Sequence, residues 1–341
     1  MSWYDHSGPE KDVFVSSRVR LARNLEDFPF EGKLSPEQAK EIIAAVRDAF
    51  PAGDAYKFID MSKINDIEAL SYYERHYISR EFAVKKSPHA LVLQDQTGLS
   101  LMICEEDHLR IQCLSGGLSL RECYKTVSET EAMLSRKLPF AFDEKWGYLT
   151  HCPTNLGTGM RVSVMMFLPA FTLLNRMEAL STQLQKVGLV IRGMGGEGSR
   201  ASGSLYQISN QETMGITEDN TLRKVIDIVR QIAEQERKLR ASFDKPMQIR
   251  LKDRAARAEG VLRHAEMVSS GECIPLYADL RLGLALGMST DMDLVKLDKM
   301  IFEAMPATVS LQQSGRTDDK LPDEMQRDIT RAQIIRKMIT P

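Results

Sequence analysis

Arginines stand at the ends of several predicted strands and loops in the first part of the chain. Arg18 and Arg20 alternate in the strand-like segment SSRVR, so both side chains point to one face of a strand. Three more follow an acidic turn, follow a glycine-rich loop or end a strand: Arg110, Arg161 and Arg192. Any one of them, taken alone, is typical of a solvated surface. As a set they suit a triphosphate, because phosphoryl transfer depends mainly on positioning and charge neutralisation, and forked guanidinium donors fit phosphate oxygens.

A glycine-rich loop after the predicted strand GLVIR contains a literal GxGxxG at 193–198. In a dinucleotide-binding unit this motif opens a helix whose N-terminus meets the pyrophosphate. Here the residues that follow indicate loop and then the strand LYQIS, so we reject the oxidoreductase interpretation. Glu197 is the notable residue of this loop, because its small neighbours let the backbone bring one carboxylate against a ligand.

Composition limits the classes of partner. The chain has 341 residues, which suits one large domain and a smaller one, and its net charge of -2 gives no broad reason to expect nucleic acid or an anionic membrane. The longest apolar stretch, 162–174, is shorter than the roughly 20 residues that span a bilayer. The N-terminus lacks the blocks of a signal peptide, and the five cysteines form no CxxC pair. We therefore expect a cytoplasmic protein without a membrane helix, a disulfide framework or a zinc site.

Capping signals and hydrophobic spacing predict an α+β framework for these groups. Ser35 and Gln38 form a capping box that opens a helix over 35–50. Short apolar runs separated by turns predict an antiparallel meander at 90–95, 99–104 and 108–114. Further predicted elements are helices at 119–138 and 217–240 and strands at 147–151, 161–168, 188–192 and 205–209. Beyond Pro246 only helical spacing occurs, near 250–268, 274–286, 291–304 and 322–338. We predict an antiparallel sheet flanked by helices in a domain over 1–245, and a small all-α domain over 246–341.

Four motifs, in order, carry a resemblance to a known family. SSRVRLARN, EEDHLRIQ, CPTNLGTGMRVSV and the RG..GEG loop with its downstream YQISN resemble segments of the ATP:guanidino phosphotransferases, the superfamily of creatine and arginine kinases. The chain is similar to the bacterial protein-arginine kinase branch over nearly its whole length, including the helical tail. The resemblance implies the glutamine-synthetase-like fold of the phosphagen kinase catalytic domain and ATP with Mg²⁺ as cofactors.

The resemblance also implies roles for individual residues. The nucleotide phosphates, bridged by Mg²⁺, would be held by Arg18, Arg20, Arg110, Arg161 and Arg192. Glu106 and Glu197 would clamp the acceptor guanidinium, with Cys152 beside it. The chemistry agrees, because a guanidinium is a poor nucleophile whose nitrogen must be aimed at phosphorus while its proton is drawn off. From the residues alone, Glu106 could equally be a solvated turn residue and Cys152 a small buried hydrophobe.

Departures from the family pattern concern substrate size and the glycine-rich loop. Creatine and arginine kinases place a helical domain before the SSRVR-type strand, which here begins at Ser16, so we expect a site open enough for an arginine within a polypeptide. The acceptor partners would be proteins with exposed arginines. Cys104 replaces the asparagine usual before EEDH, and Gly195, Gly198 and Arg200 also differ from relatives. Their effect on loop closure and rate is left open.

The tail contains a second motif. Arg327, Asp328 and Arg331 lie three or four residues apart in a predicted helix, so their side chains can share one face. Spacing alone indicates an exposed helix with an internal ion pair. The resemblance of RDxxRA to the phosphoarginine-binding motif of the bacterial protein-arginine kinases implies a second site, through which the product would activate the enzyme.

Two functions from different classes remain at this stage. The first is an active protein-arginine kinase; the second is a weakly active scaffold that binds phosphoarginine proteins and partners. By family analogy we expect a homodimer through the C-terminal helices, an activator protein, and a link to Clp-type degradation in protein quality control and stress response.

Overall fold

The computed structural model describes residues 2–5, 7–51, 53–193, 202–288, 290, 292–314 and 323–339. Glu197, Gly195, Gly198 and Arg200 lie outside these ranges. Among the described residues, no helix has both the length and the apolar character needed to cross a bilayer.

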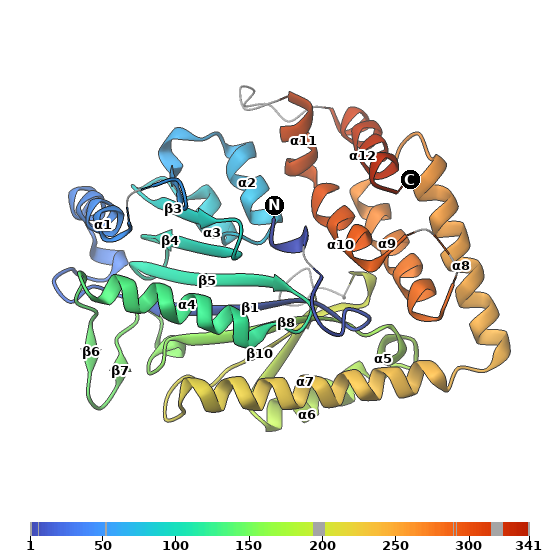
Figure 1. Ribbon diagram of the computed structural model, residues 1–341, viewed down its shortest axis with the longest axis horizontal. Coiled ribbons are helices and arrows are strands. Elements are labelled where there is room, and N and C mark those ends of the chain that lie inside the picture. Colours follow the sequence, from blue (N-terminus) through green and yellow to red (C-terminus); the bar gives the residue numbers. More distant parts are fainter. Residues whose placement is uncertain are drawn as a thin grey trace.

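An eight-stranded sheet forms the centre of the molecule, in the order β2-β3-β4-β5-β1-β8-β10-β9 (Figure 1). Its strands are β1 (Phe14–Arg23), β2 (Lys57–Asp60), β3 (Ala90–Gln94), β4 (Leu99–Ile103), β5 (Leu109–Gly116), β8 (Met160–Phe167), β9 (Leu189–Gly193) and β10 (Leu205–Asn210). Every pairing between these neighbours is antiparallel. The predicted fold class and the β3–β4–β5 meander are therefore confirmed.

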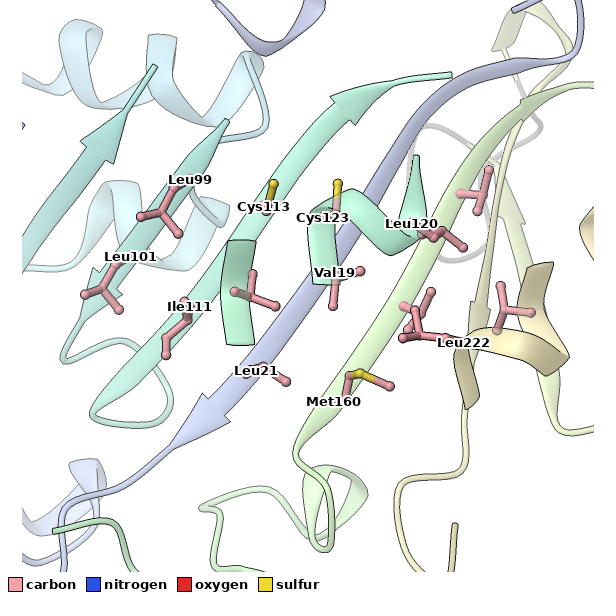
Figure 2. Packing of buried hydrophobic residues seen from close by; sticks show 14 of the residues in the cluster. Val19, Leu21, Leu99, Leu101, Ile111, Cys113, Leu120, Cys123, Met160 and Leu222 are labelled. Carbon is pink, nitrogen blue, oxygen red and sulfur yellow. The ribbon is translucent and has the colours of Figure 1, made fainter. Parts of the chain in front are cut away.

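The two faces of the sheet differ in polarity, because apolar side chains and arginines alternate along β1. Val19 and Leu21 are fully buried on one face, which packs against α4 (Leu120–Ser135) and α7 (Glu218–Ala241). Figure 2 shows Val19 and Leu21 among the apolar side chains of this layer, together with Leu120 of α4 and Leu222 of α7. Arg18 and Arg20 alternate with these residues and so point to the opposite face. Apolar burial thus fixes which way the arginines point.

Shorter helices surround the sheet. α1 (Pro36–Ala49) begins with the predicted capping box, in which Ser35 and Gln38 bind each other's backbone N–H. The others in this part are α2 (Asp66–Glu74), α3 (Arg80–Val84), α5 (Pro169–Leu173) and α6 (Met177–Lys186). One-turn 3-10 segments lie at η1 (Trp3–Asp5), η2 (Glu31–Lys33), η3 (Met61–Lys63), η4 (Pro153–Asn155) and η5 (Ser202–Ser204). The sequence did not predict β2, α2 or α3, because none of them carries a long periodic pattern.

One predicted strand is shorter than expected and lies outside the main sheet. The segment predicted as a strand over 147–151 is strand only at β7 (Gly147–Tyr148), which pairs with β6 (Phe142–Asp143) in a separate two-stranded hairpin. This hairpin projects from one end of the main sheet in Figure 1. Its strands are too short for alternation to reveal.

The described residues after α7 form helices joined by loops. The helices are α8 (Lys245–His264), α9 (Ser270–Ala285), α10 (Leu294–Glu303), α11 (Pro306–Ser314) and α12 (Glu324–Ile339). Four of these helices match the predicted segments, and α11 was missed because its short sequence PATVSLQQS has little amphipathic character.

The helices of this part pack onto the sheet and the N-terminal segment. Trp3 and Tyr4 share a buried cluster with Phe302 of α10. The fully buried Arg281 guanidinium of α9 donates to Asp298 Oδ1 at 2.9 Å and to the Lys11 carbonyl at 2.6 Å. The connection between the two parts is short, because α7 ends at Ala241 and α8 begins at Lys245.

Candidate active site

The turn between β4 and β5 carries the first predicted clamp residue. The turn is closed by hydrogen bonds from Cys104 N to the His108 carbonyl at 2.8 Å and from Glu105 N to the Asp107 carbonyl at 3.1 Å. At this position Glu106 Oε2 accepts from Arg110 Nη2 at 3.0 Å, and its side chain remains 37% exposed. Glu106 is therefore a turn residue, as its alternative interpretation held, but it also faces an arginine expected to bind phosphate.

Strand register brings the arginines together on the sheet face opposite α4 and α7. Arg20 of β1 lies directly opposite Arg161 of β8, and its neighbour on the same face, Ala22, lies opposite Arg110 of β5. Arg18, two residues before Arg20, donates to Ser163 Oγ and to Gln207 Oε1. These pairings place four of the five predicted phosphate ligands side by side.

Burial and the repulsion between like charges lower the pKa values of arginines in this cluster. Burial, followed by the charges of its neighbours, lowers the pKa of Arg18 to about 10 and the pKa of Arg20 well below its usual range. Burial and then the charges of Arg192 and Arg110 lower the pKa of Arg161. The Nε atoms of Arg20 and Arg161 are buried without a hydrogen-bond partner among the described residues. A bound polyanion would offset this repulsion and supply the missing acceptors.

A cavity of about 220 Å³ collects the predicted residues of both substrates. It is lined by Arg20, Ala22, Glu106, Arg110, Cys152, Thr154, Asn155, Gly159 and Arg161. Residues predicted to bind phosphate and residues predicted to bind the acceptor therefore line one cavity. A second cavity, of about 330 Å³, is lined by Arg18, His76, Arg80 and Gln207 among others. Arg20 and Arg110 line both cavities, so the two meet at the arginine cluster.

A tight loop holds Cys152 at the first cavity. Cys152 precedes η4, and its Sγ lies 3.0 Å from Thr154 Oγ1. Thr213 Oγ1 donates to the carbonyls of Thr154 and Leu156, which ties the loop to the segment after β10. Gly159 has φ +62, and a β-carbon there would lie 2.7 Å from the Ala22 carbonyl oxygen. Glycine is thus required for the loop to lie against β1.

The remaining predicted residues lie at the edge of this constellation or outside it. Arg192 is an exposed residue of the edge strand β9, opposite Gln207, and its charge reaches Arg161. Glu197 lies outside the described residues. His108 is structural, because its Nδ1 accepts from Leu25 N at 3.0 Å and its Nε2 donates to the Pro29 carbonyl at 2.9 Å.

Sequence reasoning missed three residues of the second cavity. His76 has φ +64, and burial together with the charge of Arg18 lowers its pKa to about 4, so its imidazole is neutral at pH 7. Arg80 is exposed and Gln207 binds Arg18. YQISN was singled out as a motif, which was the only signal for Gln207; nothing in their spacing marked His76 or Arg80.

The three residues of the tail motif have different environments in α12. Arg331 is 1% exposed and donates to the carbonyls of Ala304 at 2.7 Å and Val268 at 2.8 Å, and it pairs with Asp328. Arg327 is half-buried and its side chain makes no hydrogen bond with the described part of the chain. Of the two arginines of this motif, Arg327 is the one whose guanidinium has no hydrogen-bond partner among the described residues.

Comparison with known proteins identifies the family. Residues 37–239 match the family described as "ATP:guanido phosphotransferase, C-terminal catalytic domain", and residues 248–341 match "Protein-arginine kinase McsB C-terminal domain". The chain belongs to the ATP:guanido phosphotransferase family. It is therefore an enzyme of a phosphotransferase family that uses ATP. The predicted boundary between 245 and 246 lies in the interval between the two matched ranges.

Individual relatives and solved structures agree with this assignment. The chain is 41% identical to a protein-arginine kinase of Clostridium kluyveri over 96% of this chain and 94% of that protein. It is 39% identical to a protein-arginine kinase of Halothermothrix orenii, over 98% of this chain and 95% of that one. Among solved structures, lombricine kinase is similar in fold, with a TM-score of 0.61, 21% identity and coverage of 69% of each chain.

Proposed function

We propose that the chain transfers the γ-phosphate of ATP to the guanidinium group of arginine residues in proteins. The observation that carries this proposal is the shared cavity, in which Glu106 faces Arg20, Arg110 and Arg161. The relatives named protein-arginine kinase, at about 40% identity over nearly the whole chain, support the choice of acceptor.

In the proposed reaction the acceptor guanidinium binds at Glu106, beside Cys152, with Glu197 as the second carboxylate. The guanidinium nitrogen forms a bond to the γ-phosphorus while the bond from phosphorus to the β–γ bridging oxygen breaks, and that electron pair leaves on ADP. The guanidinium proton passes to the carboxylate of Glu106. In the free protein Arg110 Nη2 donates to Glu106 Oε2. A nitrogen of the acceptor guanidinium would replace Arg110 Nη2 at this oxygen.

The arginine cluster binds the nucleotide phosphates in this proposal. Arg20 and Arg161 each have an unpartnered Nε that can donate to a phosphate oxygen without first losing another acceptor. Arg18, Arg110 and Arg192 complete the set, and the larger cavity at His76 accommodates the nucleoside. The described residues contain no group of three or more His, Cys, Asp or Glu able to hold a metal ion. We propose that Mg²⁺ would enter as part of the MgATP substrate.

We also propose that the tail motif binds phosphoarginine. Arg327 would meet the phosphoryl group, and Asp328, held by Arg331, would meet the guanidino group. Because Arg331 binds two buried backbone carbonyls, Arg331→Ala would damage packing as well as binding. The informative variant is Arg327→Ala alone, which we expect to abolish phosphoarginine binding in calorimetric titration while nucleotide affinity is unchanged. Full-strength phosphoarginine binding by this variant would exclude the site.

The cellular setting is proposed from the resemblance alone. We propose a cytoplasmic homodimer joined through the helical domain over 246–341, which marks proteins for Clp-type degradation with the help of an activator protein. Light scattering of the purified chain tests the dimer, and a monomer at micromolar concentration would contradict it.

The experiment for the activity is direct. The chain is incubated with ATP, Mg²⁺ and an arginine-rich protein, and acid-labile phosphate on arginine is measured by mass spectrometry. We expect phosphoarginine with the wild type, at least a 100-fold lower rate with Glu106→Gln, and an unchanged rate with Glu144→Gln, a surface variant. Binding of phosphoarginine proteins with no transfer by the wild type would instead support the scaffold function.

A further inference from the structure

The short helix α3 contacts the Glu106 turn at both of its ends. At its start, Ser79 caps the helix by accepting from Phe82 N, and its Oγ donates to Glu105 Oε1 at 2.6 Å. Lys85 follows its last residue and reaches the backbone of the same turn. A five-residue helix thus spans the turn that presents the acceptor carboxylate.

The Lys85 ammonium group uses all of its donors at this turn. Its Nζ donates to the Cys104 carbonyl at 2.6 Å and to the Glu105 carbonyl at 3.1 Å, and it also binds the Glu31 carboxylate. An ammonium group has three N–H donors and no acceptor, so three oxygens satisfy it completely. The Lys85 side chain is 16% exposed, in contrast to its neighbour Lys86, which is 81% exposed and pairs only with Asp66 at the surface.

The turn needs such support because its backbone is strained. Cys104 has φ +61, a left-handed conformation that a β-carbon disfavours. Asparagine, the residue expected here from the family resemblance, tolerates this conformation better than cysteine does. Cys104 is buried, and burial raises the pKa of its thiol to about 12, so the side chain is a neutral packing group. The carbonyl of Cys104, the residue in this left-handed conformation, is one of the two that Lys85 binds.

The backbone of Arg110 does not depend on this support. Arg110 pairs in register with Ala22 on one side and Met102 on the other, so two neighbouring strands fix its backbone. Glu106 lies in the turn itself, outside the paired residues. Loosening the turn therefore moves the Glu106 carboxylate while the backbones of the phosphate arginines stay in place, although the Arg110 guanidinium loses the positions of its two acceptors, Glu105 Oε1 at 2.8 Å and Glu106 Oε2 at 3.0 Å.

We propose that Lys85 is a positioning residue, which binds the Cys104 and Glu105 carbonyls and thereby aims the Glu106 carboxylate at the acceptor guanidinium. This inference rests on the proposed function, since it assigns Glu106 to the acceptor. It predicts different effects on the kinetics of the acceptor and on the binding of the nucleotide. Loss of Lys85 affects acceptor KM and kcat, and leaves nucleotide affinity unchanged.

The kinetic test compares Lys85→Met with Lys86→Met as a matched control and Lys85→Arg as a conservative variant. We expect Lys85→Met to lower kcat/KM for a protein acceptor at least tenfold with ATP affinity within twofold of wild type, Lys86→Met to change neither, and Lys85→Arg to recover part of the loss. Because Lys85 acts through Glu106, adding Lys85→Met to Glu106→Gln should cause little further loss. Additive losses, or a parallel loss of ATP affinity, would overturn the proposal.

A second measurement separates this inference from the proposed function. Hydrogen exchange of the amides at 104–108 should be faster in Lys85→Met than in wild type and unchanged in Lys86→Met, with both variants retaining the wild-type melting temperature to within a few degrees. Unchanged exchange in Lys85→Met refutes the positioning role even if the enzyme is active. Absence of arginine phosphorylation by the wild type refutes the function, and the exchange result then still decides whether Lys85 holds the turn.

Discussion

Replacing Arg20 by methionine should stabilise the free protein and weaken its nucleotide complex. Arg20 Nε is buried without a described partner, and burial with three neighbouring arginines lowers the pKa of this guanidinium. Arg20→Met keeps most of the side-chain length and removes a charge that the free fold must desolvate against like charges. A bound anion would offset this cost.

The two effects have opposite signs and can be bounded. Replacing a buried charge by a hydrophobe of similar volume is neutral or stabilising by about 1–4 kcal/mol. Because Arg20 is partly exposed, we expect the low end, about 1 kcal/mol, which corresponds to a rise of about 1–2 °C in Tm for a chain of this size. Losing a charge-assisted hydrogen bond costs about 1.5–3 kcal/mol of binding energy, a reduction of about 10- to 150-fold in nucleotide affinity.

Thermal unfolding with and without MgATP tests both effects in one assay. At about 100 times the wild-type Kd, the ligand stabilises the wild type by about 2.7 kcal/mol, and a variant with 100-fold weaker affinity gains only about 0.4 kcal/mol. The order of melting temperatures should therefore reverse on adding nucleotide. Arg121→Met is the control, because that guanidinium is 60% exposed and lies 3.8 Å from Asp219 Oδ1; it should change neither value appreciably.

Two results would refute this reasoning. A lower Tm of Arg20→Met without nucleotide would mean that the arginine cluster does not repel itself in the free fold. An equal gain in Tm on adding MgATP, for variant and wild type, would remove Arg20 from the nucleotide site.

Three further substitutions test the surroundings of the site. The pKa of His76 is about 4 in the folded protein, below its unfolded value, so its contribution to stability is present above about pH 6.5 and is lost as the pH falls through 4. In urea unfolding over that pH range, the unfolding free energy of the wild type should therefore fall by up to about 3 kcal/mol more than that of His76→Asn. Glu74 accepts two backbone N–H groups at the start of α11, each at 2.7 Å, so Glu74→Ala should cost about 1–2 kcal/mol of unfolding free energy. Gly159→Ala places a β-carbon 2.7 Å from a β1 carbonyl oxygen, whereas Gly215, with φ +74, has nothing within 4 Å. Gly159→Ala should therefore destabilise more than Gly215→Ala in the same assay, and equal losses would exclude the clash.

Local patterns in the sequence determined the element types and the faces of β1. Alternation in SSRVR placed Arg18 and Arg20 on one face whatever the partners of the strand, since side chains alternate by backbone geometry. The Ser35–Gln38 capping box likewise depends only on residues three apart, and it is present. The motifs and their order also identified the family, now matched over residues 37–239 and 248–341.

Only the tertiary structure decided which of these residues meet. Arg161 lies opposite Arg20 because β8 pairs with β1 in one register, and a shift of one residue would turn it to the apolar face. Arg331, which spacing placed on an exposed helix, is buried because α12 packs where the Ala304 and Val268 carbonyls need donors. The contact of Lys85 with the Cys104 turn likewise joins two segments, and the local sequence of neither predicts the contact. Such contacts depend on the packing of distant segments, and no periodicity within a single segment encodes them.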